Sequence, residues 1–191
     1  MWIYLVIAAA VVAADQLTKH LVIANLELYD SIDLIPGVFR LTYIQNEGAA
    51  FGMLGNARWL FIVASSLVII GILWLLFSGR VKNRLLCVSL GLILGGGIGN
   101  MVDRLFYGEV FGSGKVVDFL DFYLFPFWTW IFNVADACVV VGTGLLILYI
   151  IISMVKESKE NKQHVEANSN DDGQDGTADG SGEQDQGTPQ D

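Results

Sequence analysis

The chain has 191 residues, of which 53% are apolar and only 16% are charged, and its mean hydropathy is +0.52. These values lie far from those of soluble domains. The net charge of −9 is local, because residues 163–191 hold eight acidic residues and no Lys or Arg. The rest of the chain is nearly neutral and lacks the basic face of a nucleic-acid-binding protein. The composition indicates a membrane protein and no nucleic-acid partner.

Four stretches are long and apolar enough to cross a bilayer as helices, which takes about 20 residues each. Together they predict an α-helical membrane domain over residues 1–162. Three of them end cleanly at charged residues, whereas the first is interrupted by charge in its second half. The expected helices are about 2–25, 59–79, 85–102 and 137–155.

The first stretch has a second interpretation as a cleaved signal peptide, because Ala8, Ala9 and Ala10 resemble a cleavage site. A signal peptide begins with a basic region, and no basic residue precedes this apolar run. We therefore expect a retained first helix, which carries Asp15 and Lys19.

Lys and Arg residues are concentrated in the short 79–84 connection and directly after the fourth helix. The longer connections, 26–58 and 103–136, contain more acidic than basic residues. Because cytoplasmic loops carry the excess of Lys and Arg, both termini and the 79–84 connection should be cytoplasmic. The two longer connections should face outward.

The outer connections carry strand signals. Residues 39–43 alternate apolar and polar side chains, as a half-buried strand does. Two valine-containing pairs, 110–111 and 116–117, flank Gly112-Ser113-Gly114 and predict a hairpin. Eight of the fourteen residues in 119–132 are aromatic, which is typical of a segment in the membrane interface. Residues 163–191 are polar, lack aromatic residues and should be a disordered acidic tail.

The notable carboxylates of the membrane domain all fall towards one membrane face. Asp15 lies about two thirds of the way across the first helix. Asp103 closes the third helix, Asp136 opens the fourth, and Asp118 lies between them. Ionisable groups at such positions are costly and indicate function by default. The pattern predicts a polar site at the outer surface of the membrane.

Several of these residues also have purely structural explanations. Asn133 and Asp136 are spaced like a helix cap and its reciprocal acid. Asp15 and Lys19 are spaced like an ion pair within one helix.

The polar and glycine residues of the third helix also have purely structural explanations. Gly91, Gly95 and Gly99 recur every four residues, which packing against a neighbouring helix would explain. Asn100 and Arg104 share a helix face, where the arginine could simply reach towards the membrane surface.

Joined together, Asp118 and Asp136 predict catalytic chemistry. Two close carboxylates cannot both ionise, so one keeps its proton while the other acts as a base towards water. Nucleophile–histidine pairs are not available, because His20 and His164 fall on opposite sides of the membrane. Cys87 and Cys138 stand alone in apolar runs, so neither a metal site nor a cofactor is expected.

Five motifs follow one another along residues 1–155: Asp15-Gln16-Leu17-Thr18-Lys19, Asn46-Glu47-Gly48-Ala49-Ala50-Phe51, Gly96-Gly97-Ile98-Gly99-Asn100-Met101-Val102-Asp103-Arg104, Val116-Val117-Asp118-Phe119 and Phe132-Asn133-Val134-Ala135-Asp136. In this order, with four helices, they resemble the prolipoprotein signal peptidases (signal peptidase II). These are integral-membrane aspartic peptidases of the bacterial inner membrane. They cleave a signal peptide just before a cysteine that carries a diacylglyceryl group, without a metal.

The resemblance implies roles for individual residues. Asp118 and Asp136 would be the catalytic aspartates. Four polar residues would line the site and hold the substrate or the catalytic carboxylates: Asn46, Asn100, Arg104 and Asn133. Asp15 and Lys19 would support the fold or the periphery of the site. The outer strands would form a small extracytoplasmic β-cradle on the membrane lipid, beside the interfacial aromatic segment.

Two features depart from the family pattern. The 105–117 connection is longer than in compact members, which affects the rim of the site, and the acidic tail has no counterpart.

Two other functions remain as alternatives. A small proton- or ion-coupled transporter would place its acids near mid-membrane and usually shows repeats or broken helices. A non-catalytic assembly factor would tolerate replacement of both aspartates by asparagine.

Overall fold

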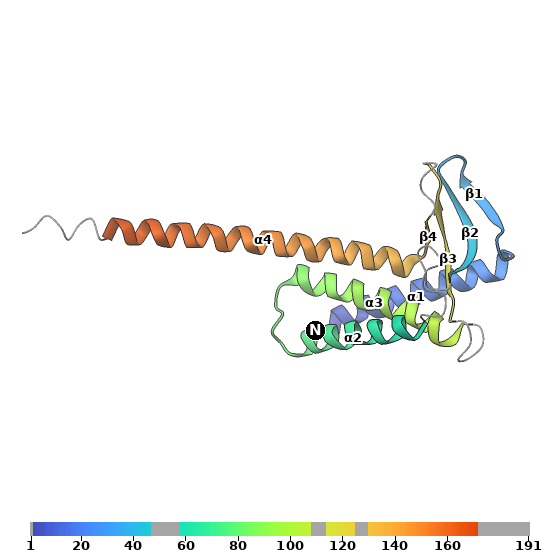
Figure 1. Cartoon of the computed structure of the whole chain (residues 1–191), viewed down its shortest axis with the longest axis horizontal. Helices are drawn as coiled ribbons and strands as arrows, with labels where there is room; N and C mark the ends of the chain where they lie inside the picture. Colours follow the sequence, from blue (N-terminus) through green and yellow to red (C-terminus); the bar gives the residue numbers. More distant parts are fainter. Residues whose placement is uncertain (1, 47–57, 108–113, 125–129, 172–191) are drawn as a thin grey trace, which may run out of the picture. The chain divides into compact units, whose positions relative to one another are not determined.

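The computed structural model describes residues 2–46, 58–107, 114–124 and 130–171. It divides into two compact units, Met1–Tyr149 and Ile150–Asp191. The elements, shown in Figure 1, are α1 (Trp2–Asn25), β1 (Ser31–Ile35), β2 (Phe39–Asn46), α2 (Arg58–Phe77), α3 (Arg84–Phe106), β3 (Val116–Phe122), β4 (Ile131–Phe132) and α4 (Val134–Asp171).

All four expected membrane helices are present, and each is long and apolar enough to cross a bilayer. α1 has the predicted bounds, whereas α2 ends at Phe77, shortly before Gly79, whose φ of 68° is unfavourable for other residues. α3 continues to Phe106, beyond the predicted end at residue 102. Its charged last turn stays helical because Asp103 finds partners inside the protein.

α4 is longer than expected at both ends. It begins at Val134 because Asn133 caps it, and it continues to Asp171. Residues 163–171, for which disorder was expected, are the last part of α4. The remainder of the acidic tail, residues 172–191, lies outside the described residues.

The strands form one antiparallel sheet in the order β1-β2-β3-β4. β2 confirms the predicted strand. Of the predicted hairpin, Val116 and Val117 pair with Asn46 and Gln45 of β2, while residues 110–111 lie outside the described residues. The two ends of the aromatic-rich stretch lie in strands, β3 and β4. Its residues 125–129 are likewise not described.

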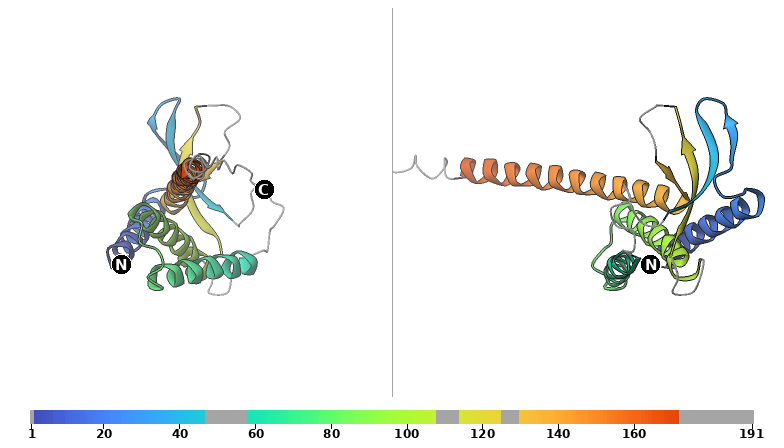
Figure 2. Two further views of the ribbon diagram at one scale, coloured as in Figure 1. Left: turned by 90° about the vertical axis from the view of Figure 1, so that its left-hand side faces the viewer. Right: turned by 45° about the vertical axis from the view of Figure 1, so that its right-hand side comes forward.

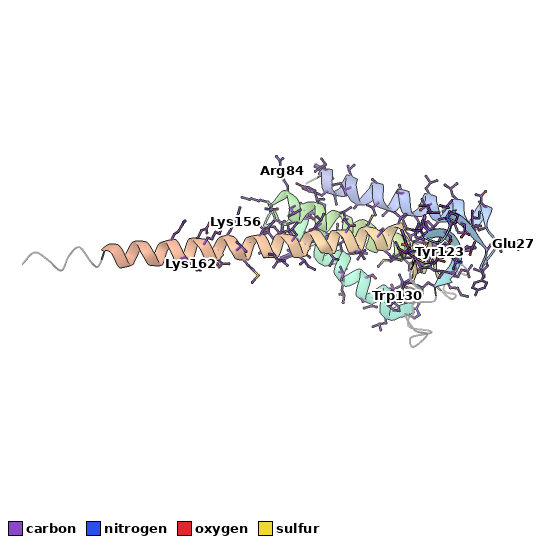
Figure 3. All side chains as sticks on the ribbon, turned by 90° about the horizontal axis from the view of Figure 1, so that it is seen from above. Glu27, Arg84, Tyr123, Trp130, Lys156 and Lys162 are labelled. Carbon is purple, nitrogen blue, oxygen red and sulfur yellow. The ribbon has the colours of Figure 1, made fainter. Side chains whose placement is uncertain are left out.

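The sheet lies at one end of the α1–α3 pair (Figure 2). A small apolar cluster joins Val22 of α1 to Tyr43, Val117 and Phe119 of the two central strands. Figure 3 shows Glu27 and Tyr123 near this end of the first unit and Arg84 at the opposite end of its helices. Because β3 is anchored to α1 in this way, the strand is held at a fixed position on the helical body.

α3 is the central helix, and its glycines allow neighbours to approach closely. A side chain at Gly95 would come within 2.8 Å of the Ala8 carbonyl oxygen on α1. One at Gly96 would overlap the Ala135 carbonyl oxygen at the start of α4. The packing interpretation of the glycine stripe is thus confirmed, and the same contacts bring α1, α3 and the start of α4 together around one end of α3.

We expect Gly96→Ala to lower the unfolding temperature, because the added methyl group must displace the backbone at Ala135. Overpacking of this kind costs about 1–3 kcal/mol. Gly97→Ala is the matched control, since its methyl group would only contact Ile69 at 3.7 Å. Thermal unfolding of both variants in detergent tests the expectation. Equal unfolding temperatures for the two would contradict it.

Candidate active site

The centre of the site is the side chain of Asn133, which is fully buried at the junction of β4 and α4. Its amide nitrogen donates to Asp118 Oδ1 at 2.6 Å and to Asn100 Oδ1 at 3.0 Å. Its Oδ1 accepts a hydrogen bond from the Asp136 backbone N–H at 2.9 Å. One asparagine therefore joins β3, α3 and α4, and it contacts both predicted catalytic residues.

Asp118 lies on β3 and is only 1% exposed. Besides Asn133, it accepts a hydrogen bond on Oδ2 from Asn46 Nδ2, at 2.9 Å. Asn46 reaches it because β2 pairs with β3, and the last residues of β2 lie beside Asp118. The predicted grouping of Asn46 with Asp118 and Asn133 is thus present in the structure.

Asp136 both caps a helix and contacts the polar site. Its Oδ2 accepts from the Asn133 backbone N–H at 3.3 Å, which completes a reciprocal helix cap with Asn133. Its Oδ1 accepts from Asn100 Nδ2 at 2.7 Å. The capping interpretation is confirmed, yet it leaves one carboxylate oxygen directed at the polar site. Asp136 is only partly buried.

The environment of Asp118 alters its acidity. Burial raises the pKa of the Asp118 carboxyl to about 7, and the nearby charge of Asp136 adds to this rise. The amide donors of Asn46 and Asn133 and the charge of Lys19 act in the opposite direction. The result is a carboxyl group that can hold a proton near neutral pH beside a second carboxylate.

A buried ion cluster lies directly behind these residues. Lys19 is 1% exposed, and its ammonium is 2.8 Å from Asp15 Oδ2 and 2.9 Å from Asp103 Oδ2. The predicted ion pair of Asp15 and Lys19 is confirmed, but the cluster also includes α3. The ammonium donates its third hydrogen bond to Asn100 Oδ1 at 3.1 Å.

The carboxylates of this cluster hold the backbone next to each predicted catalytic residue. Asp15 Oδ1 accepts from the Ala135 N–H at 2.9 Å, and Ala135 immediately precedes Asp136. Asp103 Oδ2 accepts from the Val117 N–H at 3.0 Å, one residue before Asp118. The cluster therefore contacts the backbone on both sides of the site.

Two contributors were missed by sequence reasoning as site residues. Gln16 Nε2 donates to Asp103 Oδ1 at 2.7 Å and to the Gly99 carbonyl at 3.1 Å. Asp103 was counted among the carboxylates that mark the polar site, but it was given no role there. Spacing could have identified it, because Asn100 and Asp103 are three residues apart and share a helix face.

Arg104 lies beside this network without pairing directly with the central carboxylates. Its Nη1 donates to the Asn100 carbonyl at 3.4 Å, and its guanidinium stacks over the Phe61 ring of α2 at 5.0 Å. In the part of the chain that the structure describes, no carboxylate oxygen lies within 4 Å of its guanidinium nitrogens.

Among the described residues, no three His, Cys, Asp or Glu side chains are grouped so that they could hold a metal ion. The outer part of the sheet has a separate polar group, in which Asp121 accepts from Arg40 at 2.5 Å and from Thr42 at 2.9 Å. This group joins β2 to β3 and is not part of the site around Asn133.

Fold and site together define a multi-pass membrane protein with paired carboxylates at one end of its helices. The family model for signal peptidase (SPase) II matches residues 7–152. The chain belongs to the signal peptidase II family, and it is therefore a membrane peptidase. This membership removes the transporter and assembly-factor alternatives.

Individual relatives agree with the family assignment. The lipoprotein signal peptidase of Symbiobacterium thermophilum is 46% identical over 148 residues, which are 78% of this chain and 93% of that protein. The one of Bacillus subtilis is 42% identical over 158 residues, covering 83% of this chain and 99% of the other. A solved bacterial membrane enzyme, determined in meso at 2.3 Å, matches with a TM-score of 0.70 and 29% identity. That match covers 84% of this chain and 92% of the enzyme.

We expect Asn46→Ala to raise the pKa of Asp118 further, because it removes an N–H donor that stabilises the ionised carboxylate. The measurement is the pH dependence of the protonated-carboxyl infrared band that Asp118→Asn abolishes. Gln45→Ala is the control from the same strand, since the hydrogen bonds of Gln45 go to Tyr43 and Tyr107. A band that titrates at the same pH in wild type and Asn46→Ala would contradict the assignment.

Proposed function

We propose that this chain removes signal peptides from bacterial prolipoproteins, immediately before the diacylglyceryl-modified cysteine, with Asp118 and Asp136 as its catalytic pair. The observation that carries the proposal is that both carboxylates contact Asn133: its side-chain amide donates to Asp118, and its backbone N–H donates to Asp136. Family membership supports the substrate class, since the relatives are lipoprotein signal peptidases.

In the proposed mechanism, the two carboxylates act on one water molecule. Asp136 removes a proton from the water, whose oxygen attacks the carbonyl carbon of the scissile amide. Asp118, which holds a proton near neutral pH, donates it as the amide bond breaks, so that the nitrogen leaves as an amine. The two aspartates then exchange their proton loads before the next cycle. Protons and electrons balance without any metal or cofactor.

The neighbouring amides have a defined role in this scheme. Asn46 and Asn133 donate to Asp118, and Asn100 donates to Asp136. These donors fix the directions of the carboxyl groups before substrate arrives, which reduces the reorganisation required in the reaction.

Arg104 is the proposed substrate-binding residue. Stacking on Phe61 holds the guanidinium in place, and its remaining donors could bind a peptide carbonyl or an ester oxygen of the lipid. A membrane-resident substrate of this kind would approach from the surrounding lipid, against the many exposed apolar side chains of the helices.

The proposed location is the bacterial inner membrane, with both termini in the cytoplasm and the catalytic pair at the outer face. The Lys and Arg residues of the 79–84 connection and those after the fourth membrane span support this orientation. The substrate chemistry agrees with it, because an outer-leaflet lipid presents the scissile bond at the outer surface. The acidic tail would then be cytoplasmic and outside the catalytic machinery of residues 1–162.

We expect Asp118→Asn and Asp136→Asn each to abolish cleavage, and the double variant to be little worse than either, because the two act as one unit. Cleavage of a diacylglyceryl-modified precursor is measured in detergent after membrane insertion has been verified. Asparagine caps helices about as well as aspartate does, so a purely structural Asp136 would tolerate the change. More than a few per cent of wild-type turnover in either single variant would contradict the aspartic-peptidase mechanism.

Arg104→Ala should lower turnover at least tenfold while the protein still inserts and purifies, because it removes a charged donor for the substrate. Arg104→Lys is the companion variant. It keeps the charge but loses the planar guanidinium that stacks on Phe61, and we expect intermediate turnover. Failure of Arg104→Ala to accumulate in the membrane would instead make Arg104 a structural anchor.

A further inference from the structure

We propose that Lys19 is a positioning residue for the catalytic pair: its ammonium fixes the orientation of the Asn100 amide and, through Asp15 and Asp103, the backbone next to both aspartates. The proposal rests on the catalytic role of Asp118 and Asp136. It assigns to a lysine on the first helix a role in the reaction, beyond support of the fold.

The first step of the argument concerns which way the Asn100 amide faces. An ammonium group can only donate hydrogen bonds, so the Asn100 atom 3.1 Å from Lys19 must be the oxygen. The nitrogen of the same amide then faces Asp136 Oδ1 at 2.7 Å, where it can only donate. A reversed amide would set its oxygen against a carboxylate oxygen. Lys19, together with the Asn133 amide that donates to the same oxygen at 3.0 Å, therefore directs the Asn100 N–H towards Asp136.

The second step concerns how completely Lys19 is used. A lysine ammonium has three N–H donors. Here they meet three acceptors from two helices: Asp15, Asp103 and Asn100. The group is almost completely shielded from solvent, so no water replaces a lost partner. Displacement of the ammonium thus affects all three acceptors together.

The third step connects the cluster to the spacing of the two aspartates. Asp15 holds the Ala135 N–H at the start of α4, and Asp103 holds the Val117 N–H on β3. Both carboxylates are drawn towards the same ammonium. The backbone segments that carry Asp136 and Asp118 are consequently both linked to a single charge on α1.

The test removes the ammonium while Asp103 keeps two hydrogen-bond donors, the Gln16 amide and the Val117 N–H. Lys19→Met is combined with Asp15→Asn, which preserves the net charge of the cluster and leaves an amide oxygen for the Ala135 N–H. We expect kcat on a synthetic diacylglyceryl-modified precursor to fall about tenfold to a hundredfold, with KM within about threefold. A merely structural role would lower the amount or the unfolding temperature of the protein, but not kcat per folded enzyme.

A matched control removes the ion pair of the outer sheet in the same way. Arg40→Met combined with Asp121→Asn breaks the contact between β2 and β3 while keeping the net charge. We expect this variant to unfold at a lower temperature and to keep kcat within about threefold of wild type.

The decisive measurement repeats the Lys19→Met and Asp15→Asn change in an Asn100→Ser background. The route through Asn100 is already lost in this background and only the backbone route through Asp15 and Asp103 remains, so we expect the further loss of kcat to be below about threefold. The same tenfold to hundredfold loss in both backgrounds, or an unchanged kcat in the original one, would overturn the proposal. Should the double variant fail to accumulate, Lys19→Arg replaces it in the cycle. That change keeps the charge but substitutes a planar guanidinium for the three-donor ammonium. An equal loss of kcat in both backgrounds, or an unchanged kcat in the original one, again overturns the proposal.

Failure of the positioning role and failure of the catalytic assignment are distinguishable. If Asp118→Asn and Asp136→Asn still cleave the precursor, the catalytic pair itself is wrong. If both are inactive while the Lys19→Met and Asp15→Asn change leaves kcat per folded enzyme unchanged, the catalytic pair stands and Lys19 has only a structural role.

Discussion

The buried amide of Asn133 is the interaction on which the arrangement of the site depends. It caps α4 through its oxygen and binds Asp118 and Asn100 through its nitrogen. In a membrane domain, an unpaired amide at this position would have no water to replace its partners, so all of these bonds must form together. The start of a helix, the middle of a strand and the end of another helix are thereby fixed by one side chain.

The packing of the helices allows this arrangement. Three close approaches along α3 bring its polar end within reach of α1 and α4: Gly95 against Ala8, Gly96 against Ala135 and Gly99 against Asp15. Larger side chains at these positions would separate the elements that share the hydrogen bonds. The short distances between the backbones of α1, α3 and α4 therefore allow both the apolar packing of the helices and the hydrogen bonds of the polar site.

Much of this organisation could be predicted from the sequence. The apolar runs predicted four helices, the alternation at residues 39–43 predicted β2, and five motifs predicted the residues that surround Asn133. The ends of the helices were less predictable, because they depend on contacts: α3 continues through Asp103 since this acid is paired with Lys19 and Gln16. The strand partner of Val116 and Val117 is a long-range contact, and local patterns do not contain it. Sequence spacing also could not show that capping and the polar site coexist at Asp136.

The ion pair within α1 has a consequence for how the protein enters the membrane. Lys19 and Asp15 are four residues apart on the same helix and 2.8 Å apart in space. The first helix thus contains the counter-charge of its own lysine before the third helix has been synthesised. An isolated lysine or aspartate at this depth would oppose insertion by about 2.5–3.5 kcal/mol. The internal pair reduces that barrier for the newly made segment, and Asp103 is added to an already neutralised helix when α3 follows.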